Sequence, residues 1–160
     1  MEVIIRQALP KDMESVLGLI KELAIYENEP DAVTIDAETL VENSQGDHPL
    51  FTCFVAEVSD DIVGIALVYF RFSTWKGRIL HLEDLIVPET YRNKGVGSLL
   101  YNAVMRYAKA EGVQRVSWEV LNWNTGAIDF YERTGADVLR DWHVVHFTEE
   151  RRDAYLKTMD

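Results

Sequence analysis

The chain has 160 residues, 48% of them hydrophobic and 27% charged, a composition typical of one folded domain rather than of a disordered chain. Its net charge of −11 repels nucleic acid and anionic lipid surfaces, and no apolar run approaches the ~20 residues that span a membrane. We therefore expect neither nucleic acid nor a membrane as partner. Cys53 is the single cysteine and the first residues lack a signal peptide, so we expect a cytoplasmic protein.

The first part of the chain predicts one strand followed by helices. Residues 3–8 predict a strand, and Asp12 is a candidate N-cap for the helix that follows. Residues 13–24 repeat apolar side chains every three or four positions, which predicts a helix with one buried face. A shorter helix is expected at residues 36–43.

The middle of the chain predicts three strands in succession. Residues 51–58 and 62–72 predict two strands joined by a turn, and the second is so continuously apolar that both of its faces must be covered. Residues 79–87 predict the third strand, after a connection that contains Trp75.

The last part of the chain mixes helices and strands. Residues 91–110 predict a loop and an amphipathic helix, and 116–120 alternate as a strand does. A helix is expected at 124–133, a strand that closes the sheet at 143–147, and a charged helix at 148–158. Residues 1–160 then form a single α/β domain with a mixed sheet.

A short basic glycine loop precedes the helix of residues 91–110. The first amides of a helix have no intrahelical partner, and glycine lets backbone approach a ligand closely. We expect a pyrophosphate site here, although glycines that only turn the chain would explain the loop as well. The site residues are Arg92, Asn93, Lys94, Gly95, Val96, Gly97 and Ser98.

Two adjacent carboxylates, Glu83 and Asp84, lie within the apolar strand of residues 79–87. Burying them unpaired is costly, and regular alternation points them to opposite faces unless a bulge re-aims one. We expect a base with a raised pKa at Glu83 and a cation anchor at Asp84. The alternative is structural: one carboxylate pairs with a buried Arg and the other lies at an edge.

Several ordered motifs resemble the GNAT family of N-acetyltransferases. Arg92-x-x-Gly95-x-Gly97 after an apolar strand is similar to the family's acetyl-CoA signature. The stretch from Asn122 to Ala136, with Trp123-Asn124, Phe130-Tyr131 and Gly135-Ala136, is similar to a second family motif. The closest likeness is to the diamine (spermidine/spermine) acetyltransferase group, through residues 19–24, 75–78 and 82–84. The resemblance implies acetyl-CoA as cosubstrate and a mostly antiparallel sheet of about seven strands flanked by helices.

The resemblance also implies roles for single residues. Glu83 would accept the amine proton through water, and the Leu85 amide would face the oxyanion. Tyr131 would protonate the leaving thiolate, although a tyrosine beside Phe130 is also an ordinary core residue. Further cofactor contacts would be Leu85, Ile86, Val87 and Asn124, and substrate contacts Tyr26, Glu27, Trp75, Glu83 and Asp84.

The acceptor is expected to be a primary amine on a small cation, which the net negative charge would attract. Ser73-Thr74 stand where the polyamine branch carries an acidic residue and proline, as in the branch that resembles thialysine acetyltransferases. The alternatives are an acceptor on a protein, either a lysine or the N-terminus, and a CoA-binding regulatory module without turnover. We expect no metal, since His143 and His146 would point to opposite faces of a strand. By family likeness we expect a homodimer, with residues 148–158 docked on the partner.

Overall fold

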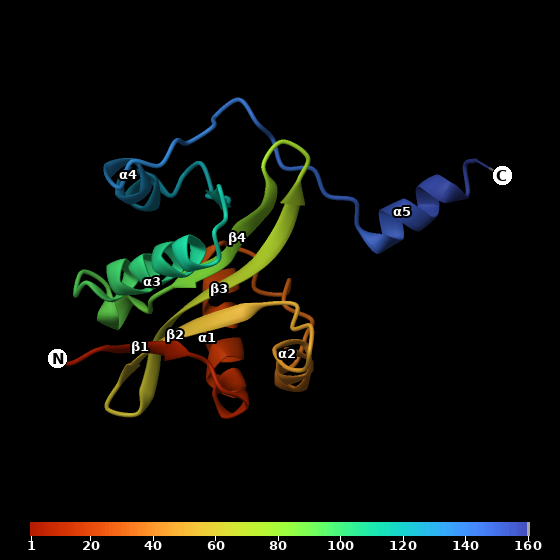
Figure 1. Ribbon diagram of the computed structural model, residues 1–160. Helices are drawn as coiled ribbons and strands as arrows, with labels where there is room; N and C mark the ends of the chain where they lie inside the picture. Colours follow the sequence, from red (N-terminus) through yellow and green to blue (C-terminus); the bar gives the residue numbers. More distant parts are fainter. Residues whose placement is uncertain (160) are drawn as a thin grey trace. The chain divides into compact units, whose positions relative to one another are not determined.

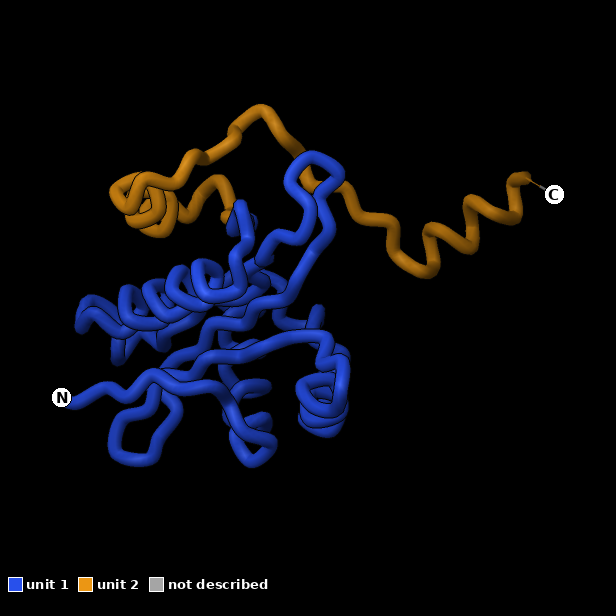
Figure 2. The backbone as a smooth tube through the Cα atoms, in the orientation of Figure 1, with its two compact units in different colours: residues 1–119 blue, residues 120–160 orange. Residues whose placement is uncertain are grey.

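The computed structural model describes residues 1–159, which fall into two compact units, Met1–Glu119 and Val120–Asp160 (Figure 2). The first unit holds one sheet, and the second holds two helices. The expected α/β class is confirmed. The assignment of residues 1–160 to a single acetyltransferase domain stays a prediction.

Within residues 1–159, five strands form the sheet, in the order in which they occur along the chain (Figure 1). Neighbours from β1 to β4 are antiparallel, whereas β4 and β5 are parallel. The sheet is therefore mixed and mostly antiparallel, as expected. The strands are β1 (Ile4–Gln7), β2 (Thr52–Val58), β3 (Asp61–Ser73), β4 (Gly77–Ile86) and β5 (Val116–Ser117).

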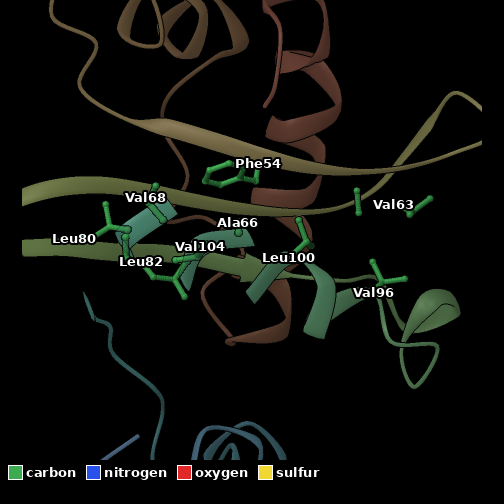
Figure 3. Packing of buried hydrophobic residues seen from close by; sticks show 11 residues of the cluster. Phe54, Val63, Ala66, Val68, Leu80, Leu82, Val96, Leu100 and Val104 are labelled. Atoms are coloured by element: carbon green, nitrogen blue, oxygen red, sulfur yellow. The ribbon is translucent and has the colours of Figure 1, made fainter. Parts of the chain in front are cut away.

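The helix α3 (Val96–Ala110) covers one face of the sheet. Val96, Leu100 and Val104 recur every four residues, so they share one side of α3 and are fully buried there. Figure 3 shows them packed against side chains of β2, β3 and β4. This α3-side core contains Phe54, Ala56, Val63, Ala66, Val68, Leu80 and Leu82 from the sheet, and Val96, Leu100, Val104 and Ala108 from α3.

The helices α1 (Met13–Tyr26) and α2 (Ala37–Asn43) cover the opposite face. Met13, Val16 and Leu17 are buried there, so the helical period read from the sequence is confirmed. We call this cluster the α1-side core. It contains Met13, Val16, Leu17, Leu19, Leu40, Cys53, Val55, Ile65, Leu67 and Ile86.

Asp12 is the residue before α1, but it does not cap the helix with its side chain as expected. Its carboxylate accepts hydrogen bonds from Arg6 Nη1 at 2.6 Å and from the Leu9 amide at 2.7 Å. Arg6 also pairs with Glu57. The carboxylate is therefore turned toward Arg6 and the Leu9 amide, which precede it in the chain, and away from the amides of α1.

The second unit contains α4 (Thr125–Arg133) and α5 (Glu149–Leu156). Asn124 caps α4 by accepting from the Ala127 amide at 3.4 Å, as expected. The expected strand at residues 143–147 is wrong, because no ladder pairs this stretch within the described residues 1–159.

The sheet consequently has five strands among the described residues rather than about seven. The alternating stretch at 116–120 contributes only the two residues of β5. An alternating pattern indicates which way side chains point, but a strand also needs a partner for its backbone. Within the described part of the chain, none of the helices is both long enough and apolar enough to cross a membrane.

Candidate active site

One extra residue in β4 creates a bulge at Glu83. In the ladder between β3 and β4, Val68 pairs with Leu82 and Leu67 pairs with Asp84, so Glu83 falls between two consecutive pairs. An inserted residue of this kind bends the strand and shifts the alternation of its side chains by one position. The condition under which the two carboxylates can share a face is therefore met.

The two cores show the shift directly. Leu82, just before the bulge, is buried in the α3-side core. Regular alternation would return the side chain of Ile86 to the same face, yet Ile86 is buried in the α1-side core. Leu85 instead packs against the α3-side core. Glu83 and Asp84 consequently both face the α1 side of the sheet.

Asp84 carries a strongly perturbed carboxyl group. Burial raises the pKa of Asp84 to about 6, and the negative charges of Glu83 and Glu27 add to the rise. Burial also raises the pKa of Glu27, the C-cap residue that follows α1. From the sequence we expect a raised pKa at Glu83, whereas the structure places one at Asp84, the less exposed of the two. Three neighbouring carboxylates make this place attractive to a cation.

Glu83 extends toward solvent, with 52% of its side chain exposed. Its Oε2 lies 3.5 Å from Nε2 of His81, a side chain that is almost completely buried. Burial raises the pKa of Tyr69, and the negative charge of Glu83 adds to that rise. The carboxylate of Glu83 thus has two polar neighbours on its own face of the sheet.

The β4 strand extends beyond its ladder with β5. The ladder ends at the pair His81–Ser117, whereas β4 continues to Ile86. Before the bulge, the Leu80 amide points to the β5 side and donates to the Arg115 carbonyl at 3.1 Å. Because backbone amides alternate in direction and the bulge shifts their phase, the Leu85 amide turns to that same side. A donor on the edge of β4 therefore lies close in sequence to both carboxylates.

The loop before α3 keeps its amides available for an anion. Gly95 precedes the helix with a φ of 83° and has no side chain that could cap it. Leu99 is the first residue of α3 whose amide has an acceptor in the helix, namely the Gly95 carbonyl. The amides of residues 96–98 therefore have no acceptor within the helix. A Cβ at Gly95 would meet nothing within 4 Å, so the space around it is open. With Arg92 and Lys94 beside it, the loop suits the diphosphate of CoA.

Arg92 connects this loop to the end of α1. Its Nε donates to the Val87 carbonyl at 2.9 Å, and its guanidinium carbon lies 4.8 Å from the centre of the Tyr26 ring. Lys94 lies 5.3 Å from the ring of Tyr91. The expected cofactor loop and the expected substrate residues at the end of α1 are therefore in direct contact.

Trp75 is not brought close to the carboxylates. It lies in the turn between β3 and β4, is 78% exposed, and its amide bonds to Ser73 Oγ at 3.2 Å. From this turn to the bulge, five residue steps along the hairpin correspond to roughly 15–20 Å. A contact between Trp75 and an acceptor would involve a part of the acceptor far from its reacting amine.

Tyr131 and Asn124 belong to the second unit. Tyr131 is buried on α4, and its ring lies 5.4 Å from that of Phe130. Asn124 caps α4. The roles of Tyr131 as acid and of Asn124 as a cofactor contact stay predictions.

Three residues beside Glu83 were not singled out from the sequence: Tyr69, Arg71 and His81. The signal is visible in retrospect, because each is a polar or aromatic side chain at an odd-numbered position of β3 or β4, on the same face of the sheet.

Among residues 1–159, no three His, Cys, Asp or Glu side chains gather as a metal site would require. Burial raises the pKa of the Cys53 thiol to about 12, which keeps the thiol protonated.

Comparison with known protein families supplies an independent finding. A model described as the acetyltransferase (GNAT) family matches residues 17–136. The matched segment includes the bulge, the loop before α3 and the whole of α4.

Comparisons with individual proteins agree with that match. A thialysine N-epsilon-acetyltransferase of Bos taurus is 38% identical, over 92% of this chain and 94% of the relative. A spermidine/spermine N(1)-acetyltransferase-like protein 1 of Homo sapiens is 35% identical over 91% of this chain, which is 22% of that longer protein. An integron cassette protein from the mobile metagenome of V. cholerae shares the fold, with a TM-score of 0.79 at 23% identity, over 98% of this chain and 99% of its own.

Proposed function

The chain belongs to the acetyltransferase (GNAT) family and is an acetyl-CoA-dependent N-acetyltransferase, and we propose that its acceptor is the primary amine of a small cation such as a diamine, a polyamine or thialysine. Two relatives with high coverage of this chain are named for acceptors of this kind, thialysine and spermidine or spermine. The Ser73-Thr74 pair before Trp75 favours a thialysine-like acceptor over spermidine.

The observation that carries the proposal is the shared face of Glu83 and Asp84. A bulge in β4 turns both carboxylates to the α1 side, and Glu27 adds a third negative charge. A cation bound there would be held by Asp84 and Glu27, while Glu83 remains accessible to solvent. A small molecule with two or more positive charges fits this arrangement better than a neutral amine does.

The amine must lose a proton before it can react. An alkyl ammonium has a pKa of about 10, so only about one molecule in a thousand is the free amine at neutral pH. We assign the acceptance of that proton to Glu83, through a water molecule. A positioned base of this kind contributes roughly 10²–10⁴ in rate.

Acetyl-CoA supplies a thioester whose carbonyl carbon the amine attacks. The amides of residues 96–98, Arg92 and Lys94 would hold its diphosphate. The Leu85 amide, on the edge of β4 beyond the β5 ladder, would donate to the carbonyl oxygen as negative charge develops there. Tyr131 would return a proton to the leaving sulfur.

A homodimer and a cytoplasmic location complete the proposal. Large apolar side chains of the second unit are exposed, among them Val145 at 88% and Trp142 at 69%. Burying such side chains against a second copy of the chain would stabilise a dimer. Light scattering coupled to size-exclusion chromatography is expected to give twice the mass of one chain, and the mass of one chain would contradict the dimer.

The acceptor is tested by measuring acetyl-CoA consumption with a panel of amines. Thialysine, lysine, ornithine, diamines, spermidine and lysine-containing peptides are compared at equal concentrations, with mass spectrometry of the products. We expect the fastest turnover with a small cationic amine. Acetylation of peptides alone would contradict the proposed acceptor, and binding of acetyl-CoA without turnover of any amine would contradict the proposed function.

A further inference from the structure

A polar cluster that the proposed mechanism does not use surrounds Glu83 on the α1 side of the sheet. It consists of Tyr69 and Arg71 from β3, His81 from β4 and Ser117 from β5, and we call it the His81 cluster. His81 is 6% exposed although it lies within a strand. A buried imidazole is costly unless its nitrogens have hydrogen-bond partners. The partners of the two nitrogens therefore indicate which one carries the proton.

Arg71 determines which nitrogen of His81 carries the proton. Its Nη1 lies 3.2 Å from Nδ1 of His81. A guanidinium is always charged and can only donate, so Nδ1 must offer its lone pair. The single proton of the neutral ring is then on Nε2. Ser117 Oγ, 3.3 Å from the same Nδ1, reinforces this assignment as a second possible donor.

The nitrogen that carries the proton faces the proposed base. Nε2 of His81 lies 3.5 Å from Oε2 of Glu83. The rings of Tyr69 and His81 are in contact, with centroids 5.0 Å apart, so the imidazole is held in place by packing against β3. At 3.5 Å the N–H and the carboxylate are at ion-pair distance, and a small rotation of the half-exposed Glu83 side chain would bring them to hydrogen-bond distance.

We infer that His81 is a positioning residue for Glu83, with Arg71 fixing the imidazole as the Nε2–H tautomer so that its N–H holds the carboxylate in place to receive the amine proton. The inference rests on the proposed function in one respect, namely that Glu83 is the base. A half-exposed glutamate on a bulge would otherwise sample several rotamers, and a base that is misplaced by ~1 Å loses much of its effect.

The charges around His81 agree with a neutral ring. Burial lowers the pKa of His81 and Arg71 lowers it further, while Glu83 and Glu119 raise it. Tyr69 contacts the ring from β3, and its own pKa is raised by burial. His81 therefore acts as a fixed donor at neutral pH and does not compete with Glu83 for the amine proton.

The first test is spectroscopic and does not need turnover. Nitrogen-15 NMR of histidine side chains at about pH 7.5 is expected to show the Nε2–H tautomer for His81. In the Arg71→Met variant, changed at an exposed side chain, both tautomers should be populated. In Glu83→Gln, the titration of His81 should move to lower pH, because a neighbouring anion has been removed. An Nδ1–H tautomer in the wild type, or an unmoved titration in Glu83→Gln, would overturn the inference.

The second test is kinetic and uses matched variants of His81. His81→Gln keeps an N–H near the position of Nε2, whereas His81→Phe keeps the ring and loses the donor. We expect kcat to fall about tenfold or more in His81→Phe and no more than about threefold in His81→Gln, with the KM for acetyl-CoA unchanged. His48→Phe, at an exposed position, serves as the surface control. Equal losses in the two His81 variants would indicate a merely structural role.

The two tests separate this inference from the proposed function. If the wild type acetylates no amine, the proposed function fails, and the tautomer and the titration still decide whether His81 is directed at Glu83. If turnover is normal but His81→Phe matches the wild type, the inference fails and the proposed function stands. Should His81→Phe not fold, Arg71→Met takes its place, with a loss of kcat expected and unchanged kcat counting against the inference.

Discussion

Glu83 and Asp84 are consecutive residues of β4, and both side chains lie on the α1 face of the sheet. A regular strand would separate them by the full thickness of the sheet, and the bulge at Glu83 removes that separation. The pair then has two environments on one face: Asp84 is partly buried near Glu27, and Glu83 is exposed beside His81. One carboxylate can bind a cation while its neighbour receives a proton from that cation.

Replacing Glu83 with Gln should remove the base and leave the fold intact. The side chain is half exposed, so we expect little change in unfolding free energy. We expect kcat to fall by roughly 10²–10⁴, because a positioned general base contributes that much. Steady-state kinetics with the best amine check this, with acetyl-CoA affinity as an internal control. Glu22→Gln, on the exposed side of α1, should behave as the wild type; a Glu83→Gln enzyme with full turnover would remove Glu83 from the mechanism.

Replacing Asp84 with Asn should change how stability depends on pH. The pKa of Asp84 is raised from 3.8 to about 6 by burial, so between these values the folded chain binds more protons than the unfolded chain. Ionising Asp84 therefore destabilises the wild type as pH rises through this window, by at most ~3 kcal/mol. Urea unfolding at about pH 4.5 and about pH 8 should show Asp84→Asn gaining stability over the wild type at the higher pH. If the unfolding free energies of Asp84→Asn and the wild type differ by the same amount at both pH values, the raised pKa of Asp84 is contradicted.

The contact between Arg92 and Tyr26 should couple acetyl-CoA binding to the end of α1. We expect Arg92→Met to weaken acetyl-CoA binding about tenfold at low salt and less at high salt, because a phosphate contact is lost. Tyr26→Leu should weaken it by a smaller factor, since it loosens Arg92. A double-mutant cycle by calorimetry should give a coupling of roughly 0.5–1 kcal/mol, as for other exposed cation–π pairs. Strictly additive effects would show that the contact has no influence on the loop.

Gly64 should be required where α3 approaches β3. A Cβ at this position would lie 3.0 Å from Leu100 Cδ1 and 3.1 Å from the Ile86 carbonyl oxygen. Because the backbone at Ile86 cannot move aside easily, we expect Gly64→Ala to destabilise the fold by roughly 1–3 kcal/mol. Gly18→Ala is the matched control: it lies in α1 with nothing within 4 Å and should stabilise by about 1 kcal/mol. Thermal or urea unfolding of both variants measures the difference, and a neutral Gly64→Ala would contradict the close approach.

The sequence predicted the elements whose pattern is local. The apolar period of α1, the cap at Asn124 and the glycine loop before α3 are confirmed because each depends on residues a few positions apart. The strand at residues 143–147 is wrong, since a strand needs a partner that alternation cannot supply. Asp12 has the sequence of an N-cap and is bonded instead to Arg6, a residue whose approach depends on the tertiary fold.

The candidate site was predicted in its residue types but not in its arrangement. A role for Glu83 and Asp84 is predicted by the presence of two carboxylates inside an apolar strand. Their shared face depends on the register between β3 and β4, and no local pattern specifies that register. The same register brings Arg71 and His81 together across the two strands, so their pairing could not be read from either strand alone.

The central claim is that an amine is deprotonated and acetylated beside the bulge in β4. It is tested most directly by a crystal structure of the chain with CoA and an unreactive analogue of the best acceptor. We predict the diphosphate at the amides of residues 96–98, and the amine nitrogen within about 3.2 Å of the Glu83 carboxylate or of a water bound to it, with Asp84 on the remaining cation. An acceptor bound elsewhere, with both carboxylates turned away from its nitrogens, would contradict the account.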